Sequence, residues 1–152
     1  MVTTTDWRRR LTAPTVGVVD WSASRPDRLA VVSTESGVSQ AWSWDLRSDT
    51  RRQASAEGVG AEEAHITPDG KGVVWWLDPQ GDERGRWMVT PFDGGSATSL
   101  FPGLPDMWMS GLSLVADSVV AGFADEDSYM VVVRHGSEPT REIYRHEQPA
   151  GA

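Results

Sequence analysis

The sequence has 152 residues, of which 39% are hydrophobic, and a formal net charge of −8 at pH 7. This length fits one domain with its own core, and no apolar run reaches the roughly 20 residues that a membrane-spanning helix needs. The acidic balance argues against nucleic-acid binding, because phosphate neutralisation needs a basic face and the only basic cluster is Arg8-Arg9-Arg10.

The sequence contains no cysteine, which removes disulfides, thiol catalysis and cysteine metal sites together. No apolar run follows the three arginines, so neither a secretory nor a twin-arginine signal is completed. We therefore expect a cytoplasmic protein that binds neither membrane nor nucleic acid. Residues 1–15 are expected to form a leader strand or a disordered arm.

The first predicted repeat covers residues 16–57 and contains four strands. Pro26-Asp27 is typical of a turn, because proline presets φ and aspartate caps the backbone locally. Trp42 and Trp44 alternate with polar residues and should share one face of a strand. The expected strands are residues 16–21, 29–32, 40–46 and 51–53.

The second predicted repeat, residues 58–103, has the clearest pattern. Pro68-Asp69-Gly70 predicts a tight turn in which Gly70 takes a positive φ. Residues 72–77 are apolar at almost every position, which favours a strand covered on both faces. A charged loop at residues 78–85, a strand at 86–92 and the turn Asp93-Gly94-Gly95 follow.

The third predicted repeat, residues 104–145, is weaker and is followed by a tail at 146–152. Its acidic turn, Asp125-Glu126-Asp127, replaces the proline-glycine turn of the second repeat. The repeat length of roughly 42 residues, with four strands in each unit, is typical of a β-propeller. The expected strands are residues 109–114, 118–123, 129–133 and 141–144.

We therefore predict an all-β fold, a partial β-propeller of about three four-stranded antiparallel blades. The alternative is a β-sandwich, which predicts alternating strands, whereas residues 73–77 do not alternate. Because propellers close with roughly 4 to 8 blades, three blades would leave the outer faces of the two terminal sheets without neighbours. Val31, Val32, Val131 and Val133 are expected to be only partly covered there.

Two stretches, residues 19–46 and 62–95, resemble the amino-terminal propeller of the prolyl oligopeptidase family of serine peptidases, in particular its acylaminoacyl-peptidase-like branch. The resemblance extends over residues 16–133. It implies a propeller that covers the active site of an α/β-hydrolase domain carrying Ser, Asp and His, and that filters peptide substrates by size.

The sequence departs from this plan because it ends at Ala152, before a hydrolase domain could begin. We expect it to be catalytically silent alone, with the absent hydrolase domain or further blades as partners and a peptide substrate only in the complete enzyme. A homodimer would supply six blades. The alternative is a non-enzymatic propeller-type binding module, completed by self-association or by another chain.

No catalytic residue is predicted. A nucleophile elbow needs Gly-x-Ser-x-Gly, and the nearest approaches, around Ser39 and Ser113, lack the second glycine. His65, His135 and His146 have no metal-ligand spacing. His65 is expected to face the central channel or to bond to a neighbouring blade.

Glu62 and Glu63 are the candidate substrate-binding residues, because dipeptidyl peptidases that resemble this family hold a substrate's amino terminus with paired glutamates. A solvated turn is the alternative for this pair. The acidic loop with Asp78, Asp82 and Glu83 lacks the alternating oxygen ligands of a calcium loop, so neither a metal nor a cofactor is predicted. The central tryptophans, Trp75, Trp76 and Trp87, are expected in the core, and Trp108 either in the core or against a partner domain.

Overall fold

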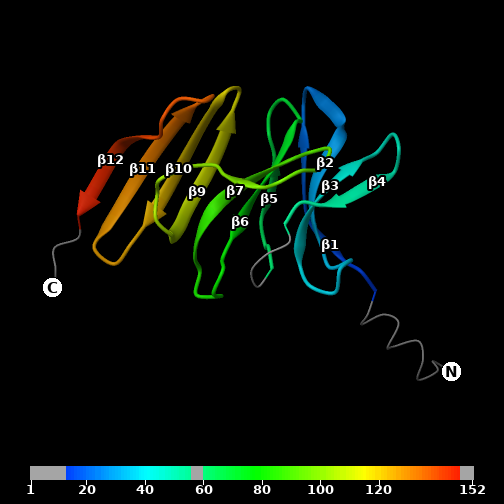
Figure 1. Ribbon diagram of the computed structural model, residues 1–152, viewed down its shortest axis with the longest axis horizontal. Helices are drawn as coiled ribbons and strands as arrows, with labels where there is room; N and C mark the ends of the chain where they lie inside the picture. Colours follow the sequence, from blue (N-terminus) through cyan, green and yellow to red (C-terminus); the bar gives the residue numbers. More distant parts are fainter. Residues whose placement is uncertain (1–12, 56–59, 148–152) are drawn as a thin grey trace, which may run out of the picture.

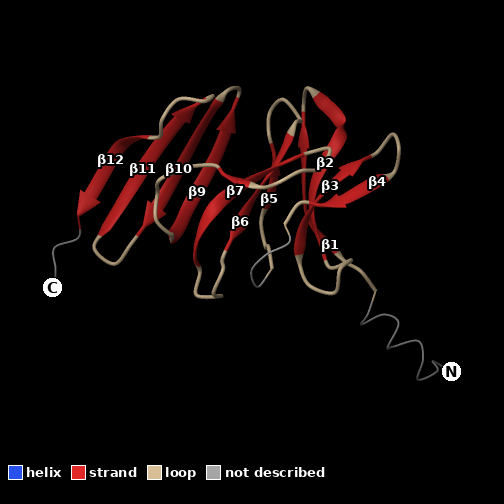
Figure 2. Ribbon diagram, viewed as in Figure 1, coloured by secondary structure: helices blue, strands red, loops and turns tan. Residues whose placement is uncertain are grey.

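The computed structural model describes residues 13–55 and 60–147, and within these ranges it contains strands and turns but no helix (Figures 1 and 2). The twelve strands form three antiparallel groups of four, which stand side by side along the long axis of the molecule. We call these groups blades 1, 2 and 3.

Each blade is a simple up-and-down run of strands. Blade 1 contains β1 (Val16–Ser22), β2 (Arg25–Ser33), β3 (Gln40–Asp45) and β4 (Thr50–Gln53). Blade 2 contains β5 (Ala64–Ile66), β6 (Gly72–Leu77), β7 (Arg84–Pro91) and β8 (Thr98–Ser99). Blade 3 contains β9 (Met107–Val115), β10 (Ser118–Ala124), β11 (Ser128–His135) and β12 (Arg141–Glu147).

The strand order follows the chain within every blade, as expected for a propeller. Blades 2 and 3 are additionally joined by a short ladder in which Arg84 pairs with Trp108 and Gly85 with Met107. The sheets do not close on themselves, so the prediction of an all-β partial propeller is confirmed. Residues 1–12 of the expected leader, 148–152 of the expected tail and 56–59 between the first two repeats lie outside the described residues.

The core between blades 1 and 2 combines small and large side chains. Ala30 and Ala41 of blade 1 leave room for Trp75 and Phe92 of blade 2, and all four are almost fully buried. Burying a tryptophan side chain removes about 150–250 Å² from water. This packing fixes the two sheets face to face.

Strand β6 supplies side chains to both of its neighbours. Val73 and Trp75 belong to the core shared with blade 1, whereas Val74 and Trp76 belong to the core shared with blade 3. All six residues of β6 are buried. The uninterrupted apolar pattern of residues 72–77 therefore correctly predicted a strand covered on both faces. Trp75, Trp76 and Trp87 lie in the core as expected.

Polar contacts reinforce the junction of blades 1 and 2. The Arg28 guanidinium donates to the Gly70 carbonyl at 3.0 Å, pairs with Asp93 at 3.3 Å and lies over the Phe92 ring at 4.3 Å. The Asp20 carboxylate accepts a hydrogen bond of 3.0 Å from the backbone N–H of Ile66. Arg28 is thus a side chain that bridges two blades.

The predicted turn at Pro26-Asp27 is wrong, because both residues lie inside β2 and the turn is formed by Ala23 and Ser24. The pairing of β2 with β1 jumps there from Arg25 to Leu29. Proline has no N–H to donate, so it is tolerated at such an irregularity in the ladder. Pro26 and Asp27 therefore lie at an irregularity in the β1–β2 ladder, just after the turn that reverses the chain.

The expected exposure of four valines is also mostly wrong. Val31, Val32 and Val133 are buried, and only Val131 is partly covered. Val32 belongs to the core between blades 1 and 2, and Val31 lies between Val19 and Trp42 in the sheet register. The exposed large apolar side chains of the described strands lie instead on β1 of blade 1 and on β9, β11 and β12 of blade 3.

Gly70 has the predicted positive φ, at 69°, and a Cβ there would lie 2.7 Å from the Cβ of Arg25. We expect Gly70→Val to lower the free energy of unfolding by about 1–3 kcal/mol. Gly37→Val is the control, because Gly37 also has a positive φ but no atom within 4 Å of a new Cβ. Equal urea midpoints for the two variants would contradict the close approach of β2 to this turn.

Candidate functional site

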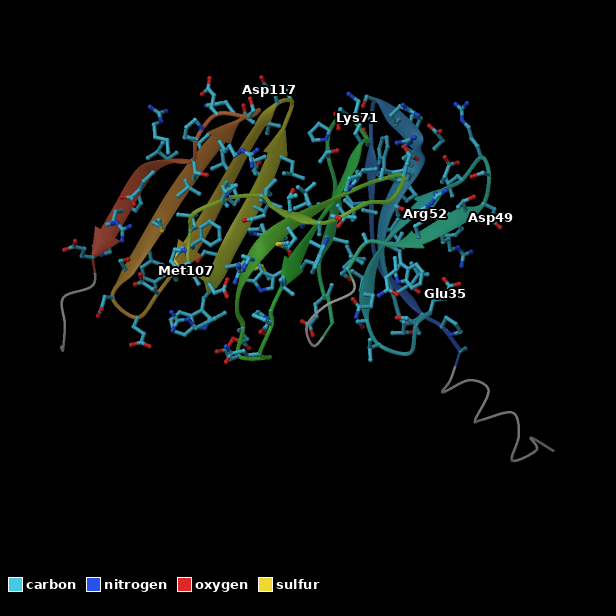
Figure 3. The ribbon with its side chains drawn as sticks, in the orientation of Figure 1. Glu35, Asp49, Arg52, Lys71, Met107 and Asp117 are labelled. Carbon is cyan, nitrogen blue, oxygen red and sulfur yellow. The ribbon has the colours of Figure 1, made fainter. Side chains whose placement is uncertain are left out.

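Two cavities lie at opposite ends of the blades. The axial cavity, of about 400 Å³, is lined by residues from the inner strand of every blade, including Asp20 of β1, His65 of β5 and Ser113 of β9. It opens beside the β1–β2 and β5–β6 turns, at the end where Lys71 is drawn in Figure 3. These three strands therefore surround a common axis, as the inner strands of a propeller do.

The second cavity, which we call the acidic cavity, has a volume of about 770 Å³. It lies among the β2–β3 loop, residues 60–63 before β5, the β6–β7 loop and the start of β9. This is the end at which Glu35 and Met107 appear in Figure 3. The side chains used below are Glu62, Glu63, Trp76, Asp78, Glu83 and Trp108.

Both sequence-predicted site residues line the acidic cavity. Glu62 is exposed and Glu63 is half-buried. Oε2 of Glu63 lies 3.4 Å from Nε2 of His65, whose Nδ1 lies 3.8 Å from Oδ2 of Asp20. His65 thus lines the axial cavity, which is one of its two expected placements, whereas its separation from Asp20 of the neighbouring blade exceeds hydrogen-bond distance. A role for Glu62 and Glu63 in binding substrate stays a prediction.

Asp78 organises the loop that forms one wall of the acidic cavity. Its carboxylate accepts hydrogen bonds from the backbone N–H groups of Gln80, Gly81, Asp82 and Glu83. Burial alone would raise the pKa of the Asp78 carboxyl, but these four donors outweigh it and hold the pKa below its usual value. Asp78 is therefore a charged carboxylate at neutral pH and keeps the loop in place.

The lining of the acidic cavity contains four carboxylates and no lysine, arginine or histidine among the described residues. Two basic groups adjoin this lining. Nε2 of His65 lies 3.4 Å from Oε2 of Glu63, and the Arg84 guanidinium lies 4.9 Å from the centre of the Trp108 ring and 3.7 Å from Glu126. Like charges in a concave site reinforce one another and attract cations. The cavity is suited to a positively charged ligand.

Serine and histidine come together at one place that the sequence did not suggest. Ser118 Oγ lies 2.7 Å from Nδ1 of His135 and 3.2 Å from Asp117 Oδ1. Ser118 of β10 and His135 of β11 are cross-strand neighbours. The Asp117 carboxylate contacts the serine, whereas in a catalytic triad the carboxylate is hydrogen-bonded to the histidine. Ser39 lines the acidic cavity and Ser113 the axial cavity, without a histidine hydrogen-bonded to either in the described ranges.

Within the described ranges, no group of three or more His, Asp or Glu side chains is arranged to hold a metal ion. The Asp78 carboxylate, which a calcium loop would use as a ligand, already accepts four backbone hydrogen bonds. None of the described segments forms a helix that could cross a membrane. Trp76, Asp78 and Trp108 were not predicted as site residues, because only the fold brings β6 and β9 to residues 60–63.

Together, the inner strands around a common axis and the open stack of four-stranded sheets define a β-propeller fold. No protein-family profile and no curated protein matches the sequence. Solved structures, in contrast, match it over most of its length.

A provisionally assigned TolB from Agrobacterium tumefaciens superimposes with a TM-score of 0.63 at 15% identity, over 88% of this chain and 51% of its own. The propeller domain of the trilobed protease from Pyrococcus furiosus gives 0.62 at 14% identity, over 90% and 43%. The acylaminoacyl peptidase of Pyrococcus horikoshii gives 0.61 at 14% identity, over 93% and 26%.

At such low identities these likenesses establish the fold. The chain spans about half or less of the length of each of these structures. Propeller domains of peptidases are among the matches, and so are TolB proteins.

Proposed function

We propose that this chain is the substrate-gating propeller portion of a serine peptidase of the prolyl oligopeptidase family, of the acylaminoacyl-peptidase-like kind. The observation that carries the proposal is the axial cavity, which is lined by the inner strands of all three blades. A passage along such an axis admits an extended peptide and rejects a folded protein. The structural likeness to an acylaminoacyl peptidase supports the same assignment.

In this proposal the chain contributes selection and no chemistry. Hydrolysis needs an activated nucleophile and an oxyanion site, and these would come from an α/β-hydrolase domain. Further blades would cover the outer faces of blades 1 and 3. Glu62 and Glu63 would contact the peptide at the end of the passage.

The likeness to TolB favours a second candidate. In it, the chain is a non-enzymatic propeller-type module that binds a protein or ligand and is completed by self-association or by another chain. The two candidates differ in whether a catalytic serine is joined to this chain.

The experiment is to isolate the native polypeptide with an antibody against residues 60–147 and to treat it with a fluorophosphonate probe. We expect a polypeptide longer than 152 residues that is labelled at a serine outside this chain. A native polypeptide of 16.6 kDa that takes up no probe would contradict the peptidase proposal and support the binding module.

The purified 152-residue chain is itself expected to leave acyl-peptide and dipeptidyl chromogenic esters and amides unhydrolysed. Ser118 provides an internal check, because its Oγ is hydrogen-bonded to a histidine, His135, at 2.7 Å. Turnover that a serine-directed inhibitor abolishes and that Ser118→Ala removes would show that the Ser118–His135 pair is a catalytic centre.

A further inference from the structure

Four carboxylates line the acidic cavity, and selecting peptides by size does not require such a concentration of negative charge. Glu62 and Glu63 come from the segment before β5, and Asp78 and Glu83 come from the β6–β7 loop. Glu62 and Glu83 are both exposed, and neither forms an ion pair with another described residue. Gathering these carboxylates costs electrostatic energy that a bound cation would relieve.

Two indole rings, those of Trp76 and Trp108, complete the cavity, and neither indole N–H makes a hydrogen bond within the described ranges. Trp76 is only 7% exposed and lines the cavity. Its indole N–H makes no hydrogen bond within the described ranges, whereas that of Trp75 donates to Thr90 at 3.0 Å. The Trp76 nitrogen is not one of the fully buried unpaired polar atoms of the described residues, so it meets solvent and is accessible to an acceptor on a ligand.

The second indole, Trp108, is half-buried at the start of β9. It already carries the guanidinium of Arg84 near its ring at 4.9 Å, so its surroundings tolerate a planar cation. Guanidinium groups stack on aromatic rings and pair with carboxylates through a fork of N–H donors, whereas an ammonium group acts as a point charge. The combination of carboxylates and indoles therefore favours guanidinium.

We propose that the acidic cavity binds an arginine side chain of a peptide or protein segment. The carboxylates of Glu62 and Glu83 attract the guanidinium, the Trp108 ring offers it a flat surface, and the Trp76 N–H donates to a carbonyl of the same segment. A volume of about 770 Å³ is within the range of roughly 300–1,000 Å³ for ligand pockets. The site belongs to this chain and does not require a catalytic domain.

The test is a titration of the 152-residue chain with a short peptide blocked at both ends, acetyl-Gly-Gly-Arg-Gly-Gly-amide, monitored by calorimetry. Its twin contains citrulline, which keeps the shape of arginine without the charge. We expect the arginine peptide to bind at least about tenfold more tightly than the citrulline peptide, and added salt to weaken its binding. Equal affinities for the two peptides would overturn the proposal.

Two further peptides separate guanidinium from other cations. One has lysine in place of arginine, and the other has five glycines and a free amino terminus. We expect both to bind more weakly than the arginine peptide. If either binds as tightly, the cavity is a general ammonium site and the arginine assignment is wrong.

The variant Glu62→Gln/Glu83→Gln removes two exposed charges from the cavity and is expected to weaken binding of the arginine peptide by about tenfold. Its control, Asp117→Asn/Glu138→Gln, removes the same charge from exposed turns between β9 and β10 and between β11 and β12. The control should bind like the parent chain. Equal losses of affinity in both variants would show that binding depends only on the net charge of the chain, and would overturn the proposal of a specific arginine site.

Trp76→Phe keeps an aromatic ring and removes the indole N–H. We expect weaker binding of the arginine peptide, with a urea midpoint recorded alongside to show that the variant is folded. A folded variant with unchanged affinity would contradict the role of the N–H. If the variant does not fold, Trp108→Leu, which removes the aromatic ring at a half-buried position, is expected to weaken binding, and unchanged affinity there would contradict the stacking role.

Discussion

Replacing Gly85 with valine is expected to abolish cooperative folding of the chain. Gly85 is buried at the point where β7 pairs with β9 and lies against the end of β6. A Cβ at this position would lie 2.0 Å from the carbonyl oxygen of Leu77 and 3.0 Å from Cε2 of Trp76. The first contact involves backbone, so it is relieved only by separating strands.

Overpacking typically costs about 1–3 kcal/mol and occasionally more, and because the clash is with backbone we expect the upper end of this range or beyond, a large share of the roughly 5–15 kcal/mol that stabilises a small domain. Gly17→Ala is the control, because its Cβ would meet only the Val32 carbonyl oxygen at 3.9 Å. Urea unfolding followed by tryptophan fluorescence compares them. Gly85→Ala adds the same Cβ as Gly85→Val and is the matched partner of Gly17→Ala, so equal midpoints for the two alanine variants would show that the junction of β6, β7 and β9 is not as close as described.

The second large effect concerns association. The exposed large hydrophobic residues of the described strands lie on blades 1 and 3 and not on blade 2. Trp21 is 58% exposed, and its partner in the sheet is Leu29, so it lies on the same face of blade 1 as Val19 and Val31. On blade 3, Val115 is 61% exposed, and Tyr129 and Tyr144 are exposed on β11 and β12.

The outer faces of blades 1 and 3, which point away from blade 2, carry these apolar side chains, and no neighbouring blade covers them among the described residues. If each exposes several hundred Å² of apolar surface, covering it would contribute several kcal/mol at about 25 cal/mol per Å². The isolated chain is therefore expected to associate or to bind apolar dyes. Two chains would supply six blades, within the roughly 4 to 8 that close a propeller, so the dimer is the specific form of this expectation.

Polar replacements on the two faces test the origin of the association. Trp21→Ser/Tyr144→Ser is expected to lower dye binding and the associated fraction in sedimentation velocity. Leu46→Ser is the control, because Leu46 is similarly exposed but lies in the β3–β4 turn, away from both sheet faces. Equal reductions in both variants would show that association is nonspecific.

The sequence predicted the fold well wherever one strand contained its own signal. Strand β6 is apolar on both sides because it lies between two sheets, and that pattern appears in any sequence reading. Pro26-Asp27 misled because proline is compatible with both a turn and a bulge, and only the pairing with β1 decides between them. Val31 was misjudged because its burial depends on the tertiary fold, and a missing neighbouring blade did not leave it exposed.

The candidate site was only half predictable. Glu62 and Glu63 are adjacent in the sequence and stand out as a charged pair. Trp76 reads as core, and it is core, yet one edge of its ring reaches the cavity. Asp78 and Trp108 reach the same cavity only because the β6–β7 loop and the start of β9 lie beside residues 60–63, a tertiary relationship that no local pattern encodes.

The central claim is that these residues form three blades of an open propeller whose two outer faces require cover. Size-exclusion chromatography with light scattering, at tens of micromolar, tests it most directly. An open propeller is expected to show a mass above the 16.6 kDa of one chain, with two chains as the specific species, or a single chain that binds an apolar dye strongly. A cooperatively folded monomer without dye-binding surface would contradict it.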